Sequence, residues 1–120
     1  MKIKLIPIGG PEQLTARVDG DILTVNGVSL DFSPLPEGGM LPNAAISSLW
    51  VFGDVRRVDG EVYLTLVLPH SNDAPHETRF PAAYDVPMTV VDGLVPLPPY
   101  DAPPVVEDVQ LPDIEPEVTP

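Results

Sequence analysis

The chain contains no cysteine in its 120 residues. This absence excludes a disulfide framework, a thiolate metal site and a cysteine nucleophile. Long apolar runs are also missing, because the N-terminal segment MKIKLIPIGG is interrupted by Pro7 and ends in two glycines, well short of a signal-peptide core or a membrane span. We therefore expect a soluble protein that is made in the cytoplasm and is not inserted into a membrane.

Basic residues are scarce: six lysines and arginines stand against eighteen acids, for a formal net charge of −12. The imbalance is uneven, because residues 1–100 hold twelve acids and all six bases, whereas residues 101–120 hold six acids and no base. Nucleic acid and anionic membranes are bound by Lys and Arg side chains that displace counterions. We therefore expect no direct binding to nucleic acid.

Seventeen prolines leave few windows in which a helix of average length can form. The length fits one small domain. The sequence predicts an all-β fold, either a small antiparallel β-sandwich or a meander or barrel-like domain, with one short helical turn. We place a compact β domain over 1–101 and an acidic, proline-rich tail, extended or disordered, over 102–120.

The segment LTARVDGDILTVNGVSLDF carries two hairpin signals, Asp19-Gly20 and Asn26-Gly27. Both dipeptides readily adopt the positive φ angles of a type I′ turn. They predict a three-stranded meander, with strands over about 14–18, 21–26 and 28–32. The side chains expected to face the core are Leu23, Val25, Val28, Leu30 and Phe32.

The segment SLWVFGDVRRVDGEVYLTLVLPH repeats this pattern with longer strands, over about 53–58 and 61–68, joined at Asp59-Gly60. In the second strand Val62, Leu64, Leu66 and Leu68 lie on one face, opposite Tyr63, Thr65 and Val67. We expect this strand to be central. Pairing of Arg56 or Arg57 with Glu61 across the turn would be a surface contact of about a few tenths of a kcal/mol.

Between the two ribbons, SPLPEGGMLPNAAISSLW reads as a loop that crosses from one to the other. Its portion 42–48 can form one or two helical turns, with Ile46, Leu49 and Trp50 on a shared face. Trp50 is the only tryptophan, and its default role is to anchor the core. We also keep it as a candidate partner-binding residue.

After Leu68 the chain becomes irregular. A short strand at 87–91, a turn at Asp92-Gly93 and an extended segment, LVPLPPYD, end the domain. The tail APPVVEDVQLPDIEPEVTP is more apolar than a spacer needs, so we predict that part of it docks as an extended peptide, on its own body or on a neighbour. The candidate partner-binding residues of the tail are Val105, Val106, Val109, Leu111 and Ile114.

The loop PHSNDAPHETRF holds both histidines, His70 and His76, with Asp73 between them. Two imidazoles and a carboxylate could surround a metal ion, but the spacing matches no standard zinc pattern and a polar surface loop is the simpler interpretation. No serine lies in a Gly-x-Ser-x-Gly frame, and neither glycine pair continues into a phosphate-binding pattern. We predict no catalytic, cofactor-binding or metal site.

The tetrapeptide RVDG occurs at 17–20 and 57–60, and a shorter copy, VDG, at 91–93. The sequences between the copies do not align, so a structural repeat is not indicated. Its aspartates have no companion that would make them an acid, a base or a ligand. We predict that all three copies mark strand reversals.

The stretches LDFSPLPEGGMLP, VRRVDGEVYLTLVLPHSNDAPHETRFP and VPLPPYD, in this order, resemble a group of small acidic proteins encoded among the tail genes of tailed phages and prophages of Gram-negative bacteria. The resemblance covers nearly all of residues 1–101. The group carries no enzymatic motif, so no site residue is transferred. The resemblance implies a context in the virion tail or its assembly, after synthesis in the host cytoplasm.

The principal hypothesis is a non-enzymatic structural or accessory protein of the tail tip or fibre region, located in the virion, that acts by protein–protein contacts. Its expected partners are other tail or fibre proteins and, through an exposed strand edge, further copies of the chain. One alternative is an assembly chaperone that leaves before the virion is complete. Another is an acidic inhibitor that mimics nucleic acid to block a host protein, although the acids of the body fall mostly at predicted turns.

Overall fold

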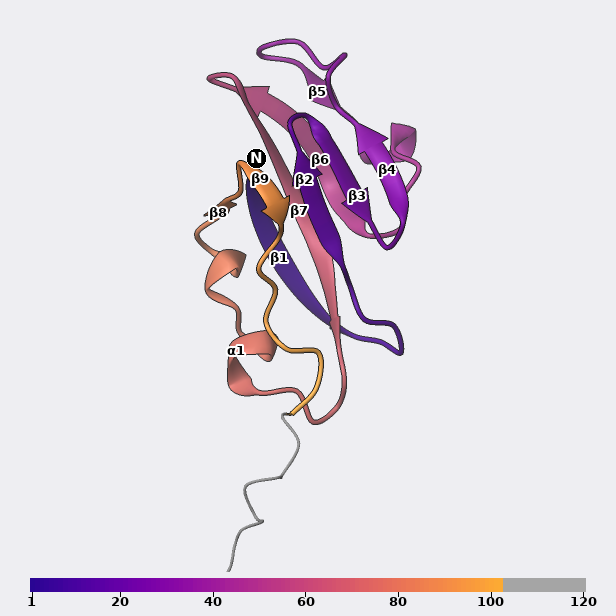
Figure 1. Ribbon diagram of the computed structural model, residues 1–120, viewed down its shortest axis with the longest axis vertical. Coiled ribbons are helices and arrows are strands. Elements are labelled where there is room, and N and C mark those ends of the chain that lie inside the picture. Colours follow the sequence, from indigo (N-terminus) through magenta and orange to yellow (C-terminus); the bar gives the residue numbers. More distant parts are fainter. Residues whose placement is uncertain (103–120) are drawn as a thin grey trace, which may run out of the picture.

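Two β-sheets stack face to face in the computed structural model, which describes residues 1–102 (Figure 1). The five strands of sheet A are, in spatial order, β5 (Met40–Leu41), β6 (Val51–Val58), β7 (Glu61–His70), β1 (Lys2–Gly9) and β8 (Met88–Thr89). The four strands of sheet B are β4 (Val28–Asp31), β3 (Ile22–Val25), β2 (Ala16–Asp19) and β9 (Asp92–Leu94). The described residues also form the short helical segments η1 (Asn43–Ala45), α1 (His76–Arg79) and η2 (Ala82–Tyr84). The predicted all-β class is confirmed.

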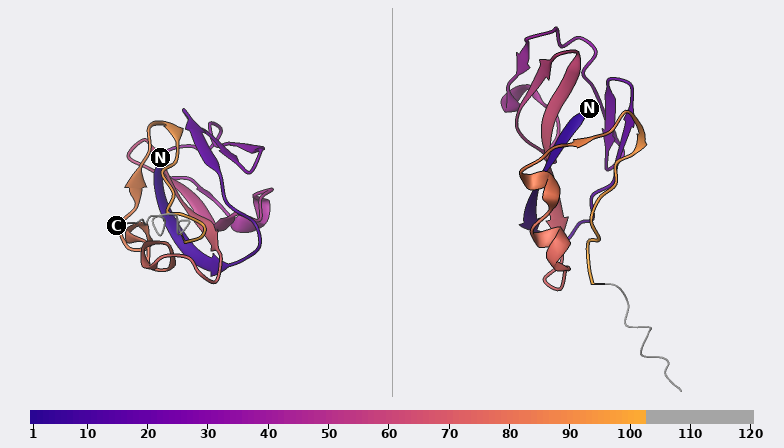
Figure 2. Two further views of the ribbon diagram at one scale, coloured as in Figure 1. Left: turned by 60° about the horizontal axis from the view of Figure 1, so that its bottom comes forward. Right: turned by 90° about the vertical axis from the view of Figure 1, so that its left-hand side faces the viewer.

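The core lies between the two sheets, which are seen as two layers in the right-hand view of Figure 2. From sheet A it takes the predicted face of β7, which is Val62, Leu64, Leu66 and Leu68. From sheet B and its flanks it takes Val18, Leu23, Val25, Leu30 and Phe32. Burying each of these side chains contributes about 1.5–3 kcal/mol before the entropy of folding is subtracted. The prediction that β7 is central is also confirmed, because it is the middle strand of sheet A.

Strand β1 has no counterpart in the sequence-based prediction. Its buried Ile3 and Leu5 alternate with Lys2 and Lys4, and it runs parallel to β7 over its whole length. Parallel strands are joined by long connections and have no tight turn that marks their pairing in the sequence. Strand β8 pairs with only Lys2 and Ile3, so the rest of β1 has a free edge, where Pro7 is tolerated.

The two complete RVDG copies reverse the chain by different turns. In the second copy Asp59 and Gly60 are the two loop residues, with φ of 51° and 78°, the signs of the predicted type I′ turn. In the first copy Asp19 still pairs with Ile22, so the loop residues are Gly20 and Asp21 and only Gly20 has a positive φ, 62°. This sign pattern is that of a type II′ turn.

The third copy does not reverse the chain, and the predicted final hairpin is wrong. Asp92 and Gly93 lie within β9, where Gly93 pairs with Val18 of β2. The preceding strand, β8, belongs to sheet A, so residues 90–91 cross from one sheet to the other. Gly93 keeps a positive φ of 96°, which is why glycine is favoured there even without a turn.

Two predicted side-chain placements are wrong: Val28 was expected to face the core, and Leu49 to share a helical face with Ile46 and Trp50. Val28 is the first residue of β4, the edge strand of sheet B, next to the Asn26-Gly27 turn, and 48% of it is exposed. Leu49 is 92% exposed because the helical segment η1 ends at Ala45, so residues 46–50 share no helical face. Ile46 and Trp50 do pack against the core.

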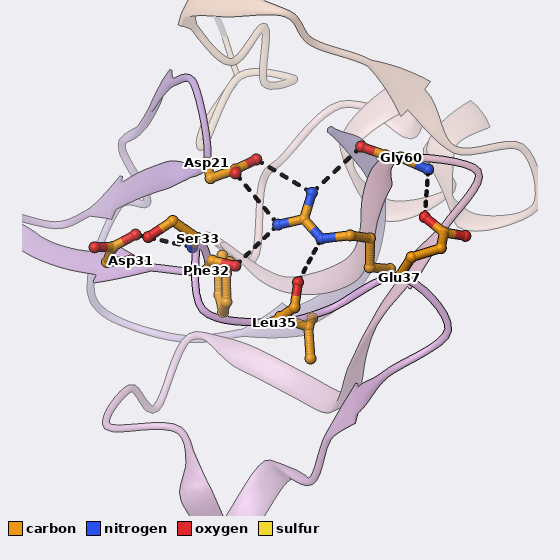
Figure 3. A network of polar contacts seen from close by, with 8 residues as sticks. Asp21, Asp31, Phe32, Ser33, Leu35, Glu37 and Gly60 are labelled. Atoms are coloured by element: carbon orange, nitrogen blue, oxygen red, sulfur yellow. Dashed lines mark hydrogen bonds and ion pairs between the residues drawn. The ribbon is translucent and has the colours of Figure 1, made fainter.

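The crossing segment 32–39 is attached to the body by Arg57, whose side chain is only 12% exposed (Figure 3). Its Nε donates to the carbonyl of Leu35 at 2.6 Å and its Nη2 to the carbonyl of Phe32 at 2.9 Å. Its Nη1 donates to the carbonyl of Gly60 at 3.3 Å. Nη2 also lies 3.2 Å from Oδ2 of Asp21, so the ion pair joins the two RVDG turns. We call these five residues the Arg57 cluster.

Glu37 binds the second turn from the other side. Its carboxylate accepts the backbone N–H groups of Asp59 and Gly60, both at 2.7 Å. Figure 3 shows the bond to Gly60. The predicted pairing of Arg56 or Arg57 with Glu61 is wrong, because the Arg57 guanidinium points to the crossing segment and Glu61 lies 4.0 Å from Lys2 instead. Arg57 and Glu37 therefore both bind the crossing segment to the β6–β7 hairpin.

We expect Arg57→Lys to lower the free energy of unfolding by about 1–3 kcal/mol, because an ammonium cannot donate to the carbonyls of Phe32, Leu35 and Gly60 at the same time. Arg56→Lys, on the exposed neighbour, is the matched control and should change stability by less than about 0.5 kcal/mol. Urea unfolding of both variants measures this. Equal stabilities would show that the cluster contributes nothing beyond charge.

Gly20, Gly60 and Gly93 have positive φ, and a β-carbon added at any of them would meet no other atom within 4 Å. Replacing any of them with valine should therefore cost at least about 1–2 kcal/mol through backbone strain alone. Gly9→Ala is the control, because Gly9 has open space and no positive φ. Thermal unfolding of the four variants tests this, and unchanged midpoints for the three valine variants would contradict it.

Candidate interaction surface

The side chains that point outward from sheet A form a surface that we call the outer face. Cross-strand register places Lys2, Tyr63 and Arg56 in one row and Lys4, Thr65 and Phe52 in the next. Ile6 then lies opposite Val67, and Ile8 opposite Pro69. The outer face is therefore basic where β1 begins and apolar where it ends.

An irregularity in β6 sets the rows in which Phe52 and Arg56 lie on this surface. Phe52 pairs with Thr65 and Arg56 with Tyr63, so three residues of β6 lie opposite the single Leu64. Gly53, with a φ of 75°, absorbs the extra length. The register shifts by two residues, which keeps the alternation of faces: Val51 and Val55 are buried in the core, whereas Phe52 and Arg56 are exposed.

Segment η1 fixes this irregular stretch. The Asn43 side-chain amide donates to the carbonyls of Val51 and Gly53, at 3.0 and 3.1 Å. The Asp54 carboxylate accepts the backbone N–H of Asn43 at 3.1 Å. The predicted helical turn within 42–48 thus exists and supports the outer face from the β6 side.

Large apolar side chains are exposed on the outer face. Phe52, in the row of Lys4 and Thr65, is 55% exposed. At the end of β1, Ile8 is 51% exposed, and Phe80 and Tyr84, beside β1, are 65% and 54% exposed. The last two border an open pocket of about 510 Å³ that Ile6 of β1 also lines. Aromatic side chains on a concave surface contribute much of the energy of protein contacts.

The basic end is a shallower hollow of about 280 Å³. Its lining includes Lys2, Lys4 and Arg56, with Tyr63 and Asp54 among them. Lys2 donates to the Thr89 hydroxyl at 2.6 Å, whereas Lys4 and Arg56 are exposed. Half of the six basic residues of a chain of net charge −12 therefore gather at one place.

The outward surface of sheet B is different. Arg17 and Thr24 share one row, and Thr24 exchanges a hydrogen bond with Ser29 at 3.2 Å. The next row, across the four strands, is Asp92, Asp19, Ile22 and Asp31. Asp19 and Asp92 were expected at turns, but they lie with Asp31 in strands on one face. Sheet B thus presents a mainly polar, acidic surface.

The histidine loop does not assemble into a site. His70 Nδ1 contacts the carbonyl of Ser71 at 2.8 Å, and His76 stacks on Phe80 with ring centroids 4.7 Å apart. Across residues 1–102 no three His, Cys, Asp or Glu side chains are grouped so as to hold a metal ion.

The partner-binding candidates are placed as follows. Trp50 is half-buried against the core, and its carbonyl accepts the N–H of Val67 at 2.8 Å, at the apolar end of the β6–β7 pair. Its role in partner binding stays a prediction. The tail candidates Val105, Val106, Val109, Leu111 and Ile114 lie outside the described residues.

The segment before the tail is bound to the C-terminal ends of β1 and β7. The Tyr100 hydroxyl donates to the carbonyl of Gly10 at 2.5 Å, and the Tyr100 carbonyl accepts the N–H of Ser71 at 2.9 Å. The Ser71 hydroxyl donates to Asp101 at 2.6 Å, and the Ala102 N–H to the same oxygen at 2.7 Å. The hydrogen bond from Ser71, followed by that from Ala102, lowers the pKa of the Asp101 carboxyl below its ordinary 3.8.

None of the helices in the described part of the chain is long and apolar enough to cross a membrane. Compared with protein-family models, with curated proteins and with solved structures, the chain matches none of them.

The contact between Asp101 and Ser71 should stabilise the fold above pH 3.8 and be lost as the pH falls through the lowered folded-state pKa. NMR titration of the Asp101 side-chain carbonyl should therefore give a midpoint below 3.8. Ser71→Ala should move that midpoint up towards the ordinary value. A midpoint that Ser71→Ala leaves unchanged would contradict this contact.

Proposed function

We propose that the chain is a non-enzymatic structural or accessory protein of a phage tail tip or fibre region, and that it binds another tail protein through the outer face of sheet A. The observation that carries the binding role is the exposure of Phe52, Ile8, Phe80 and Tyr84 around one continuous sheet surface. Burying such side chains against a partner releases about 25 cal/mol per Å² of apolar surface. The phage context is supported by the sequence resemblance alone.

The edges of the sheets offer a partner fewer contacts than the outer face does. Both edge strands of sheet A, β5 and β8, are two residues long, and β4 and β9 at the edges of sheet B have four and three. The part of β1 that β8 leaves unpaired is contacted by η2 and α1 and contains Pro7, which has no N–H to donate. Short edges provide few backbone hydrogen bonds for an added strand. We therefore place the main contact on the outer face, with the tail as a second contact along a neighbour.

The row of Asp92, Asp19 and Asp31 is the one observation that favours the alternative of a nucleic-acid mimic. It is a single row with an apolar Ile22 within it and Arg17 in the next row. A mimic of a phosphate backbone needs a longer array of charge. The tail-protein role and the assembly chaperone both use the outer face, and they differ in whether the chain stays in the particle.

Quantitative mass spectrometry of purified phage particles tests the proposal. We expect the wild-type chain at a fixed copy number per particle, and Phe52→Asp to lower that number about tenfold, because a charge in the contact costs more than about 1.4 kcal/mol.

Ile22→Asp is the matched control, since Ile22 lies on the outward surface of sheet B and is 37% exposed. It should be incorporated like the wild type. Absence of the wild-type chain from particles would overturn the structural role and favour the chaperone. Equal incorporation of Phe52→Asp would show that the outer face is not the contact.

A further inference from the structure

We infer that the basic end of the outer face is a docking site for an acidic extended peptide, and that its occupant in the free protein is the chain's own segment 103–120. The inference rests on the proposed role of the outer face as a contact surface and adds an occupant that a partner must displace.

Charge complementarity is the first argument. Segment 103–120 contains five acids and no base, whereas Lys2, Lys4 and Arg56 line one hollow whose single acidic lining residue is Asp54. The remaining bases offer no comparable group. Arg57 is held in its cluster, Arg17 shares a surface with three aspartates, and Arg79 donates to the carbonyl of Ala74 and lines a pocket with Asp85. Attraction between an acidic peptide and a basic hollow is strongest at low ionic strength.

The point where the segment begins is the second argument. Tyr100 is bonded to Gly10 and Ser71, so Ala102 lies at the ends of β1 and β7, which is the apolar end of the outer face. Figure 1 shows the described chain ending there, at the end of the molecule where α1 lies. The segment therefore starts beside the surface that it is proposed to cover.

Segment 103–120 is long enough to reach the basic end of the outer face. From Gly9 back to Lys2 the strand rises by about 23 Å, at about 3.3 Å per residue. Eighteen further residues span up to about 60 Å when extended. The chain can pass around the end of sheet A and still bring its acids to Lys4 and Arg56. Its Val105, Val106 and Val109 would then pass the apolar rows of Ile8 and Ile6.

Paramagnetic relaxation in the full-length protein tests the inference. The chain has no cysteine, so Gln110→Cys gives one site for a nitroxide label. We expect the label to reduce the amide signals of Lys4, Thr65 and Arg56 at least threefold relative to the reduced label. The amide signals of Thr24 and Ser29 on sheet B should not change.

Charge reversal supplies the matched control. In the labelled protein, Lys4→Glu with Arg56→Glu should abolish the signal loss, whereas Arg17→Glu should leave it unchanged. About 1 M salt, at which the Debye length is about 3 Å, should reduce it. Signal loss that the double variant retains would overturn the inference.

The source of the tail is tested by mixing spin-labelled chains with unlabelled chains that carry ¹⁵N. Signal loss in the unlabelled ¹⁵N chains of this mixture would overturn docking on the same molecule and place the tail on a neighbouring copy. An absence of signal loss in the labelled protein itself would overturn the inference altogether. Neither result bears on incorporation into particles, so the proposed function is tested separately by mass spectrometry of the particles.

Discussion

The guanidinium of Arg57 joins three segments that no strand pairing connects: the crossing segment, the first RVDG turn and the turn between β6 and β7. The crossing from β4 to β5 contains Pro34 and Pro36, which have no backbone N–H and cannot join a ladder. Its carbonyls at Phe32 and Leu35 accept hydrogen bonds from Arg57 instead, while the ion pair with Asp21 ties sheet B to the turn between β6 and β7. One side chain thus binds the crossing segment and joins sheet B to the turn between β6 and β7.

The two outward surfaces of the sandwich follow from how regular each sheet is. Sheet B is a plain meander with a fourth strand added, so its outward residues keep the polar alternation of a solvated face. Sheet A contains the irregularity at Gly53, which shifts the register by two residues and so places Arg56 in the row of Tyr63 and Lys2, while Val51 and Val55 stay in the core. The aromatic and basic side chains collected on sheet A are the basis for assigning it the contact surface.

The sequence predicts local structure correctly where turn chemistry and side-chain alternation act over a few residues. Asn26-Gly27 and Asp59-Gly60 form hairpins, and the buried face of β7 is the predicted one. The candidate surface was not predictable in the same way. Its rows combine residues of β1, β7 and β6. The parallel pairing of β1 with β7 joins residues about sixty positions apart, and no tight turn in the sequence indicates that pairing. The alternation of Lys2, Ile3, Lys4 and Leu5 was the one available signal for β1.

The repeated RVDG separates what the sequence determines by itself from what depends on tertiary contacts. It determined that glycine supplies a positive φ at 20, 60 and 93, because that freedom is a property of the residue. It also determined the all-β class, since prolines exclude long helices and alternation selects strands. Only the tertiary structure decided that the first copy turns one residue later than the second, that the third lies inside a strand, and that Arg57 is enclosed while Arg17 is exposed. The physical reason is that pairing partners and burial are set by contacts between distant segments, which four identical residues do not specify.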